Sequence, residues 1–261
     1  MILSRLGNKK MIAKDIIKHF PEHRTYIEPF FGAGGLYFNK PKAQYNILND
    51  LDSDVYNLYN VLQQEPEKFR TSILDLMETQ DLYKYWIKHK ETEPIKKAIR
   101  FIYLSNWGYL GRMGCMSLQT SCNKKQLILE RLDITIEALK HIQITNLDCI
   151  KMLKSICFKG IVDVEKSFVY CDPPYINTEN NYSNSFSETN LIELLEKLID
   201  MKVKFAISEF KNDKTLEIAN KYNLNVIDIR ERITFQKYVR TEILMTNYIH
   251  NKKPIKINEF F

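Results

Sequence analysis

The sequence predicts an α/β fold, a doubly wound and mostly parallel sheet with an antiparallel hairpin at its C-terminal end. Strand-like apolar runs alternate with helical segments near the N-terminus and again after residue 141, and this alternation is typical of parallel sheets. From about Phe69 to Lys140, helical segments and aromatic-rich loops replace it. We therefore expect one domain formed by residues 1–55 and 141–261, interrupted by a mainly helical insert over residues 56–140.

The elements of the first half follow from local patterns. Residues 11–20 have helical spacing and stop at Pro21, since proline cannot continue a helix. The segment TYIEPFFGAGGLYF (25–38) predicts a short strand, a glycine turn and the start of a helix. YNILNDLD (45–52) predicts a second strand that ends in acids, and a helix should follow over residues 53–64.

Strand patterns return in the second half, and helical patterns separate some of them. Strands are expected at 142–148, 167–175, 203–210 and 224–230. Helices are expected at 190–201 and 214–222. From Val226 to His250 there are two strand patterns with no helix between them, so we expect a hairpin that closes the sheet.

The bulk composition limits the class of protein. A formal charge of +6 and a pI of about 8.9 suit a polyanionic partner without requiring one. The five cysteines form no CxxC pair, so we expect neither a metal site nor disulfides. The N-terminal residues have no signal-peptide pattern and no apolar run is long enough for a membrane span. We expect a cytoplasmic protein without membrane contact.

The first two strands end in residues suited to binding a nucleoside. Glu28-Pro-Phe-Phe-Gly-Ala-Gly-Gly allows a sharp turn and close approach of a ligand, although a tight strand-to-helix turn explains it equally. Asp50 ends the second strand, where a carboxylate can accept hydrogen bonds from ribose hydroxyls or merely cap the next helix. Because the loop is not GxGxxG and no GK[ST] occurs, a nucleoside without a pyrophosphate fits better than NAD or ATP.

A third strand ends in Asp172-Pro-Pro-Tyr175. Pro173 and Pro174 cannot donate to a ladder and have a fixed φ, so the strand must stop there. The stop holds Asp172 and Tyr175 in fixed directions and leaves the Pro173 carbonyl free to accept. Two acceptors beside an aromatic face can bind an exocyclic amino group on a planar ring.

With these motifs, the sequence resembles the Dam-like, α-group (D12 class) family of S-adenosylmethionine-dependent DNA adenine-N6 methyltransferases. YIEPFFGAGG resembles the family's FxGxG element, NILNDLD its ribose-binding acid, and FVYCDPPY its catalytic DPPY. Gly7-Asn8-Lys9 resembles its N-terminal GGK-type segment. The resemblance covers most of the chain apart from the insert.

The resemblance implies a Rossmann-like catalytic domain (1–55 and 141–261), a target-recognition insert (56–140), and transfer of a methyl group from S-adenosylmethionine to N6 of an adenine flipped out of DNA. The implied catalytic residues are Asp172, Pro173, Pro174 and Tyr175. Cysteine chemistry is not needed, so Cys171 is interpreted as a small buried strand residue. The implied cofactor-binding residues are Gly7, Lys9, Glu28, Pro29, Phe30, Gly32, Gly34, Asp50, Asp148 and Asp172; for Asp148 a helix cap is an equal alternative.

The expected DNA contacts lie in the insert, in the loop after the catalytic motif and in the C-terminal hairpin. They are Trp107, Tyr109, Arg112, Lys124, Lys125, Tyr182, Phe186, Lys237 and Arg240. The insert departs from GATC-specific relatives, because Arg112 directly follows Gly111 and MSLQTSCNKKQ replaces their hairpin. The DNA sequence that is recognised is therefore not predicted. Glu209 stands where relatives usually have an asparagine.

The predicted partner is double-stranded DNA, with no metal, and the predicted chain is a monomer or weak dimer from a bacterial cell, phage or plasmid. A cognate restriction endonuclease would make it half of a restriction-modification pair; otherwise it acts alone. Two alternatives remain open. The same chemistry could act on RNA or a protein glutamine, since DPPY-type motifs bind amides and amines alike, or the chain could be a DNA-binding module without activity.

Overall fold

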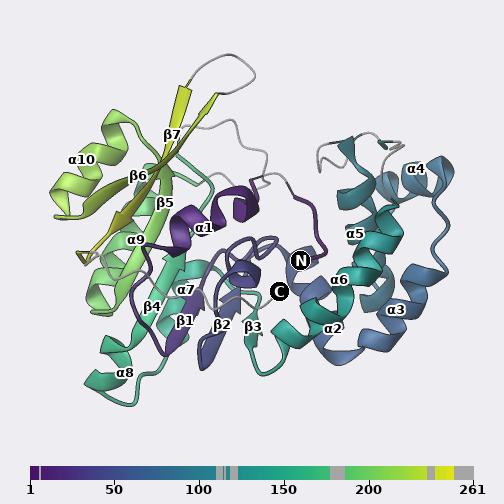
Figure 1. Ribbon diagram of the computed structural model, residues 1–261, viewed down its shortest axis with the longest axis horizontal. Helices are drawn as coiled ribbons and strands as arrows, with labels where there is room; N and C mark the ends of the chain where they lie inside the picture. The colour runs from purple at the N-terminus through teal and green to yellow at the C-terminus, as the bar shows by residue number, and fades with distance from the viewer. Residues whose placement is uncertain are drawn as a thin grey trace.

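The computed structural model describes residues 1–5, 7–109, 114, 116–117, 123–176, 186–233 and 239–249. Within these residues one seven-stranded sheet has the order β3-β2-β1-β4-β5-β7-β6 (Figure 1). The strands are β1 (Thr25–Glu28), β2 (Tyr45–Asn49), β3 (Gln143–Thr145), β4 (Ser167–Cys171), β5 (Lys204–Phe210), β6 (Asn225–Ile233) and β7 (Val239–Thr246). Strands β1 to β5 pair in parallel, and β7 runs antiparallel to both β5 and β6. The predicted parallel sheet with a C-terminal hairpin is confirmed.

The strand order reverses between β1 and β4, which are neighbours in the centre of the sheet. From β1 the chain proceeds outward through β2 to β3, whereas β4 leads to β5 on the other side. Ligands of open α/β sheets bind beyond the carboxyl ends of the strands at such a reversal. Here those ends are Glu28 on β1 and Cys171 on β4, directly before Asp172.

Helices cover both faces of the sheet. The 3-10 helix η1 (Lys9–Ile12) and α1 (Ala13–Ile17) cover one face; α7 (Cys149–Ser155), α9 (Glu188–Asp200) and α10 (Asp213–Lys221) cover the other, and α8 (Ile161–Glu165) precedes β4. Alternate strand residues point to opposite faces. Phe168 and Tyr170 therefore join the core beneath α1, while Val169 and Cys171 join the core beneath α9. Cys171 is fully buried, as expected.

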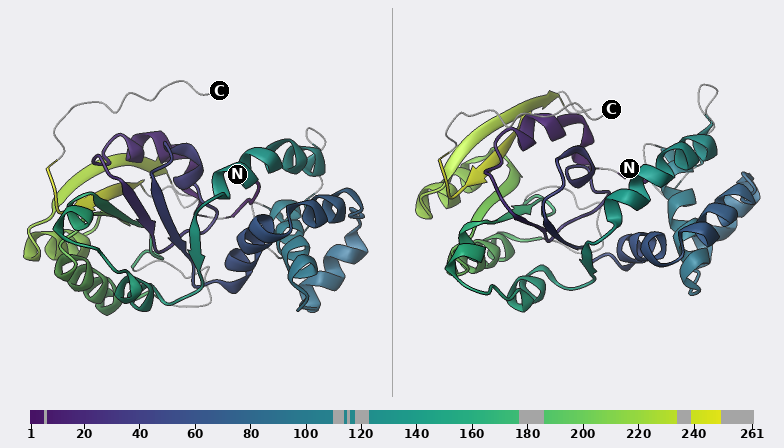
Figure 2. Two further views of the ribbon diagram at one scale, coloured as in Figure 1. Left: turned by 90° about the horizontal axis from the view of Figure 1, so that it is seen from below. Right: turned by 60° about the horizontal axis from the view of Figure 1, so that its bottom comes forward.

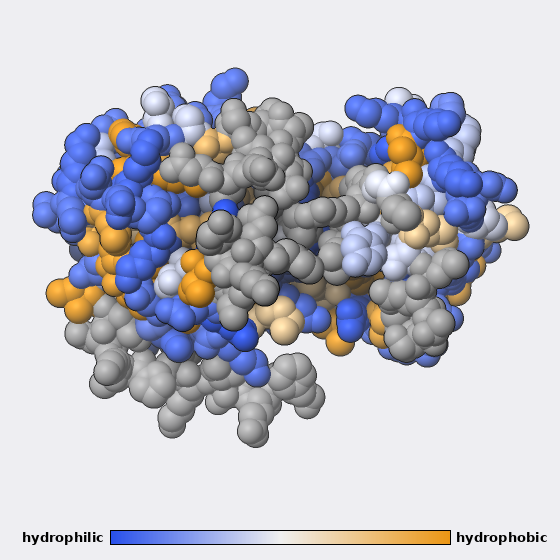
Figure 3. Space-filling model, turned by 90° about the horizontal axis from the view of Figure 1, so that it is seen from above, coloured by the Kyte–Doolittle hydropathy of each residue, from blue (hydrophilic) through white to orange (hydrophobic). Residues whose placement is uncertain are grey.

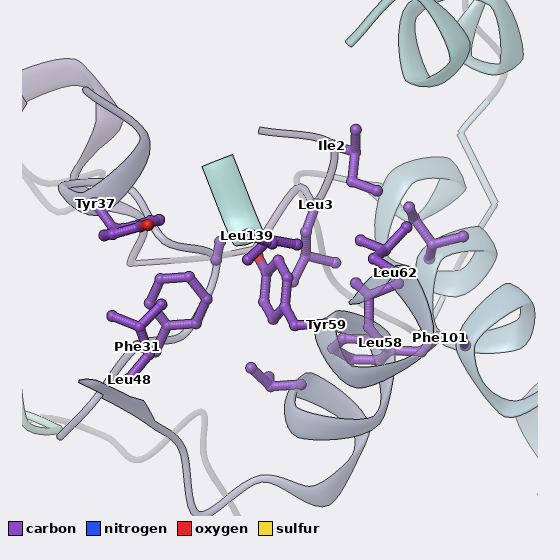
Figure 4. Close-up of a cluster of buried hydrophobic side chains, with 14 of the residues drawn as sticks. Ile2, Leu3, Phe31, Tyr37, Leu48, Leu58, Tyr59, Leu62, Phe101 and Leu139 are labelled. Carbon is purple, nitrogen blue, oxygen red and sulfur yellow. The ribbon is translucent and has the colours of Figure 1, made fainter. Parts of the chain in front are cut away.

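In the described part of the chain between β2 and β3, five helices stand together beside the β3 edge of the sheet (Figure 2). They are α2 (Ser53–Gln64), α3 (Pro66–Leu74), α4 (Gln80–Lys88), α5 (Pro94–Trp107) and α6 (Lys124–Leu139). Their apolar core is continuous with that of the sheet, because Tyr59 on α2 packs against Phe31 and both belong to one buried cluster with Phe101 of α5 (Figure 4). The predicted domain boundary, between residues 55 and 56, lies inside α2. The division into two domains stays a prediction.

The helix expected after the glycine turn is wrong in type and length. Only a three-residue 3-10 helix, η2 (Tyr37–Asn39), follows the turn. Lys40 is extended (φ −111°, ψ 158°) and precedes Pro41, and a residue before proline is disfavoured in the α conformation. The Tyr37 hydroxyl donates to the Ala138 carbonyl at 2.6 Å and ties this short turn to α6.

The outer surface is largely hydrophilic in the view of Figure 3, with apolar side chains in small groups. In the part of the chain that the structure describes, none of the helices is both long enough and apolar enough to cross a membrane.

Candidate active site

The loop after β1 places glycines where other residues would not fit. Gly32 and Gly34 have φ of +53° and +70°, a region that glycine adopts without a steric cost. A Cβ on Gly34 would lie 2.5 Å from the Phe38 ring, whereas a Cβ on Gly32 would meet no atom of the described residues within 4 Å. Gly34 therefore allows close packing within the loop, and Gly32 borders open space that a ligand can fill.

Gly35 brings the N-terminal segment against this loop. A Cβ on Gly35 would lie 2.2 Å from Asn8 Oδ1 and 2.9 Å from the Lys9 backbone nitrogen. The Asn8 side chain accepts from the Lys10 N–H at 2.9 Å and so caps η1. Gly7, with φ of +82°, turns the chain into this cap. The glycine loop thus determines where Lys9 begins its helix.

Gly35→Ala should therefore destabilise the protein and disturb Lys9. The added methyl must displace backbone atoms, and overpacking of this kind costs about 1–3 kcal/mol. Thermal melting should show a lower midpoint, with methyl-transfer activity falling as well. Gly114→Ala is the matched control, because its Cβ would meet none of the described residues within 4 Å. An unchanged midpoint for Gly35→Ala would contradict the close contact.

Asp50 follows β2 and is bound to the glycine loop. Its Oδ2 accepts from the Gly32 N–H at 2.6 Å and its Oδ1 from the Asp52 N–H at 2.9 Å. Burial raises the pKa of the Asp50 carboxyl, and these two N–H donors oppose that shift. Leu51 and Leu147 stand nearby with 52% and 37% of their surfaces exposed. An acid, an open glycine and two exposed leucines together suit the ribose and base of a nucleoside.

Other residues predicted to bind the cofactor already have partners. Asp148 caps α7, since its Oδ1 accepts from the Ile150 N–H at 3.0 Å, so the helix-cap alternative is observed and a cofactor contact stays a prediction. Glu28 is 2% exposed and accepts from the Tyr26 hydroxyl at 2.9 Å; burial raises its pKa well above the usual value. The Pro29 carbonyl accepts from the Asn49 amide at 2.9 Å.

Lys9, which is buried, and Asp172, which is half-buried, form an ion pair at the end of β4. The Lys9 Nζ lies 2.7 Å from Asp172 Oδ1 and 3.5 Å from Glu242 Oε1. Burial raises the pKa of the Asp172 carboxyl, whereas Lys9 lowers it. A carboxylate has about four lone-pair sites, so Asp172 can still accept a hydrogen from a ligand while it is paired. The contact predicted between Lys9 and the cofactor's carboxylate stays a prediction.

Tyr175 is fixed from three sides. Its hydroxyl donates to the Glu242 carboxylate. Its ring meets the Phe210 ring edge-on, with centroids 4.5 Å apart, and the Lys9 Nζ lies 4.7 Å from its centroid. Pro173 is buried and Pro174 half-buried between Asp172 and Tyr175. Sequence reasoning missed Glu242; the available signal was an acid directly before the apolar run Ile243-Leu244-Met245.

Glu209 holds the segment that follows Tyr175. Its Oε1 accepts from the Ile176 N–H at 2.8 Å and its Oε2 from the Phe210 N–H at 2.7 Å. Burial raises the pKa of this carboxyl to about 8. The Glu209 carboxylate therefore accepts from two backbone N–H groups beside Tyr175. One belongs to Ile176, the next residue in the chain, and the other to Phe210, whose ring packs against Tyr175.

The raised pKa of Glu209 predicts a pH-dependent stability. The folded pKa is about 8 and the ordinary value 4.5, so the folded state binds more protons between these values and its free energy of unfolding falls as pH rises through about 8. Glu209→Gln cannot titrate, so urea unfolding at about pH 5, 7 and 9 should give it a flatter pH dependence than the wild type. An identical slope in both proteins would show that Glu209 does not titrate in this range.

The predicted DNA-binding residues of the helical insert differ in exposure. Tyr109 is 59% exposed. Trp107 is 3% exposed and its indole N–H donates to Glu78 at 2.9 Å. Lys125 donates to the Leu74 and Leu76 carbonyls at the end of α3, and Lys124 donates to the Ser117 carbonyl at 3.3 Å. The four DNA contacts stay predictions, and Tyr109 presents the largest exposed surface of them.

The remaining predicted DNA contacts lie nearer the catalytic motif. The Arg240 guanidinium lies 5.3 Å from the Phe210 ring, which in turn packs on Tyr175. Phe186 meets Phe30 edge-on, with centroids 5.9 Å apart. The predicted contacts Arg112, Tyr182 and Lys237 lie outside the described residues. Lys97 and Arg100, also basic, contact the protein itself, through Asp54 and the carbonyls of Trp86 and His89.

Within the described ranges there is no group of three histidine, cysteine, aspartate or glutamate side chains placed to hold a metal ion. The predicted site residues thus form two groups, Gly32 with Asp50 after β1 and β2, and Asp172 with Tyr175 after β4. Both lie at the carboxyl edge of the sheet, on either side of the reversal in strand order.

A doubly wound sheet with Asp-Pro-Pro-Tyr at the end of a central strand is the arrangement that the sequence predicted for a methyltransferase. The chain belongs to the D12 class N6 adenine-specific DNA methyltransferase family, whose model matches residues 6–234. It is an enzyme that methylates adenine in DNA, as the sequence predicted. The family membership inferred from the sequence motifs is likewise confirmed.

Curated relatives match over most of their length and share one type of name. The chain is 27% identical to a DNA adenine methylase of Salmonella typhi, over 91% of this chain and 90% of that protein. It is 26% identical to a DNA adenine methylase of Escherichia coli strain K12, with the same two coverages. Among solved structures, an rRNA methylase from Streptococcus thermophilus matches with a TM-score of 0.41 and 8% identity, over 91% of this chain and 96% of that one.

Proposed function

We propose that the chain transfers a methyl group from S-adenosylmethionine to the N6 amino group of an adenine flipped out of double-stranded DNA. The observation that carries this proposal is the strand end at the reversal of the sheet, where Asp172 and Tyr175 stand fixed beside the glycine loop. In general, a base inside a duplex is beyond the reach of an enzyme's reactive groups, so it must leave the stack.

The loop and the end of β2 fit the proposed cofactor. Gly32 borders open space, and the adjacent Asp50 carboxylate and exposed Leu51 and Leu147 offer a polar and an apolar surface. Asp50 would accept from ribose hydroxyls, and the leucines would contact the adenine ring. When bound, S-adenosylmethionine supplies an electrophilic methyl group on a positively charged sulfur.

The catalytic motif binds and orients the target base. Tyr175 offers its ring for stacking, while the Asp172 carboxylate and the Pro173 carbonyl accept the two N6 hydrogens. These two hydrogen bonds direct the nitrogen lone pair at the methyl carbon. On accepting the methyl group that the cofactor would supply, N6 would lose one proton to Asp172 or to water. The protein's contribution is positioning and electrostatics.

The basic charge of the chain supports DNA as the polymer. Arg240 lies exposed beside Phe210, one ring away from Tyr175, where it can contact a phosphate next to the flipped base. Tyr109 in the insert is exposed and can contact DNA from the other side. The curated relatives named DNA adenine methylase favour the same substrate.

One incubation separates the possible substrates. Methyl-labelled S-adenosylmethionine is mixed with the protein and equal amounts of double-stranded DNA, RNA and unfolded protein, and label is counted in each fraction. We expect label in DNA alone. Label in RNA or at protein glutamine would show that the same chemistry acts on another polymer. No label in any fraction would favour a DNA-binding module without activity.

We also propose that the protein acts in the bacterial cytoplasm, since its curated relatives are bacterial. A phage or plasmid origin, a cognate restriction endonuclease and a monomeric or weakly dimeric state remain part of this proposal. Sequencing of the genes beside it and sedimentation of the purified chain test these points.

A further inference from the structure

Glu242 is a buried acid that the proposed reaction does not use directly. It lies on β7, next to Phe210 of β5 in the sheet, and only 1% of it is exposed. Because strand residues alternate between faces, its side chain shares the face of Leu244, beneath η1 and α1. A carboxylate at such a position costs free energy unless it is paired and hydrogen-bonded.

Two partners compensate this acid, and both belong to the reaction site. The Tyr175 hydroxyl donates to Glu242 Oε1, and the Lys9 Nζ lies 3.5 Å from the same oxygen. Lys9 is only 2.7 Å from Asp172, so one ammonium is shared between two carboxylates. Glu242 therefore contacts both the residue that stacks on the base and the residue that controls the charge of Asp172.

We propose that Glu242 is a positioning residue for methyl transfer: its carboxylate fixes the Tyr175 ring through the hydroxyl and keeps the Lys9 ammonium between Asp172 and itself. This inference rests on the proposed roles of Asp172 and Tyr175. Glu242 does not touch the base. It acts through Tyr175, which is proposed to stack on the base, and through Lys9, which pairs with Asp172. It also links the C-terminal hairpin to the chemistry, since β7 is the strand that carries it.

The network makes a prediction about charge. Lys9 lowers the pKa of Asp172, and Glu242, a like charge, raises it. Loss of Glu242 should therefore shift the acid limb of kcat to lower pH, whereas loss of Lys9 should shift it to higher pH. The titratable and charged groups that face this pair are Lys9 on η1, Glu28 on β1, Tyr170 on β4, Tyr175 after β4, Glu209 on β5 and Arg230 on β6, the register partner of Glu242.

The test compares Glu242→Gln, Glu242→Leu and Tyr175→Phe, with Glu231→Gln as control for a lost charge on the exposed part of the same hairpin. Methyl transfer to DNA is measured as kcat and KM over pH, and folding by thermal melting. We expect Glu242→Leu to lower kcat about 10- to 100-fold, the effect of one lost hydrogen bond to a charged group. KM for S-adenosylmethionine should change little. Glu242→Gln keeps the acceptor for Tyr175 and should lose less activity while showing the full shift of the acid limb.

A double-mutant cycle tests the coupling directly. If the Tyr175 hydroxyl acts through Glu242, Tyr175→Phe should lower kcat in the wild type but have almost no further effect in Glu242→Leu. Additive losses, or an acid limb unmoved by Glu242→Gln, would overturn the proposal. Should Glu242→Leu fail to fold, the isosteric Glu242→Gln decides it by the shift of the acid limb alone. The wild type is measured first. If it does not methylate DNA, the proposed function is wrong; if it does and the variants fail the two criteria, only the role of Glu242 is wrong.

Discussion

Asp172→Ala should lose methyl transfer while keeping most of its affinity for S-adenosylmethionine. The substitution removes an acceptor for the N6 hydrogen, and loss of one such group in the transition state lowers kcat by about 10²- to 10³-fold or more. The groups proposed to bind the nucleoside, Gly32 and Asp50, are untouched. Single-turnover transfer of labelled methyl to DNA measures the first effect, and isothermal titration with the cofactor measures the second.

The control for this variant is Asp200→Ala, at the C-terminal end of α9, where the acid is exposed and paired only with a surface lysine. It should retain wild-type turnover. Circular dichroism must show that Asp172→Ala is folded, because Lys9 loses its closest partner. Turnover within a few-fold of the wild type in a folded Asp172→Ala would remove the acid from the mechanism.

Lys9→Met should reduce both stability and activity. The methionine keeps the length and apolar body of the side chain but leaves the half-buried Asp172 and the buried Glu242 without their shared ammonium. Removing one partner of a buried ion pair costs about 3–5 kcal/mol. The pKa of Asp172 should rise further because the group that lowers it is gone, so less of the carboxylate form is present at neutral pH.

Two measurements check the Lys9 prediction. Urea unfolding should give a lower free energy of unfolding for Lys9→Met, and the pH profile of kcat should show its acid limb at higher pH than in the wild type. Lys10→Met is the matched control, since Lys10 is the exposed neighbour on the same short helix. An unchanged acid limb together with unchanged stability would show that the ion pair does not determine the charge of Asp172.

Much of the fold could be predicted because its signals are local. The prolines at positions 173 and 174 predict the end of β4, which stops at Cys171, and the apolar periodicity predicts the helices of the second half. The position of Asp50 also follows from sequence, as the acid after a strand that itself follows a glycine turn. These features depend on residues that are close in the sequence, so the sequence pattern alone predicts them.

The contacts that organise the site could not be predicted in the same way. Lys9, Asp172 and Glu242 come from the N-terminal segment, the centre and the C-terminal hairpin of the chain, and only the folded sheet brings them together. The burial of Trp107 and Arg100 likewise depends on the packing of α4 and α5 against each other. The short η2 has a local cause: Pro41 disfavours the α conformation at Lys40, so the helix cannot continue.

The identity of the methylated nucleoside tests the function most directly. Double-stranded DNA of mixed sequence is incubated with the protein and S-adenosylmethionine, digested to nucleosides and analysed by mass spectrometry beside synthetic standards. N6-methyl-2′-deoxyadenosine should be the product, formed by the wild type and absent with Asp172→Ala. A product methylated on cytosine, or equal product from both proteins, would contradict adenine N6 transfer at the Asp172–Tyr175 site.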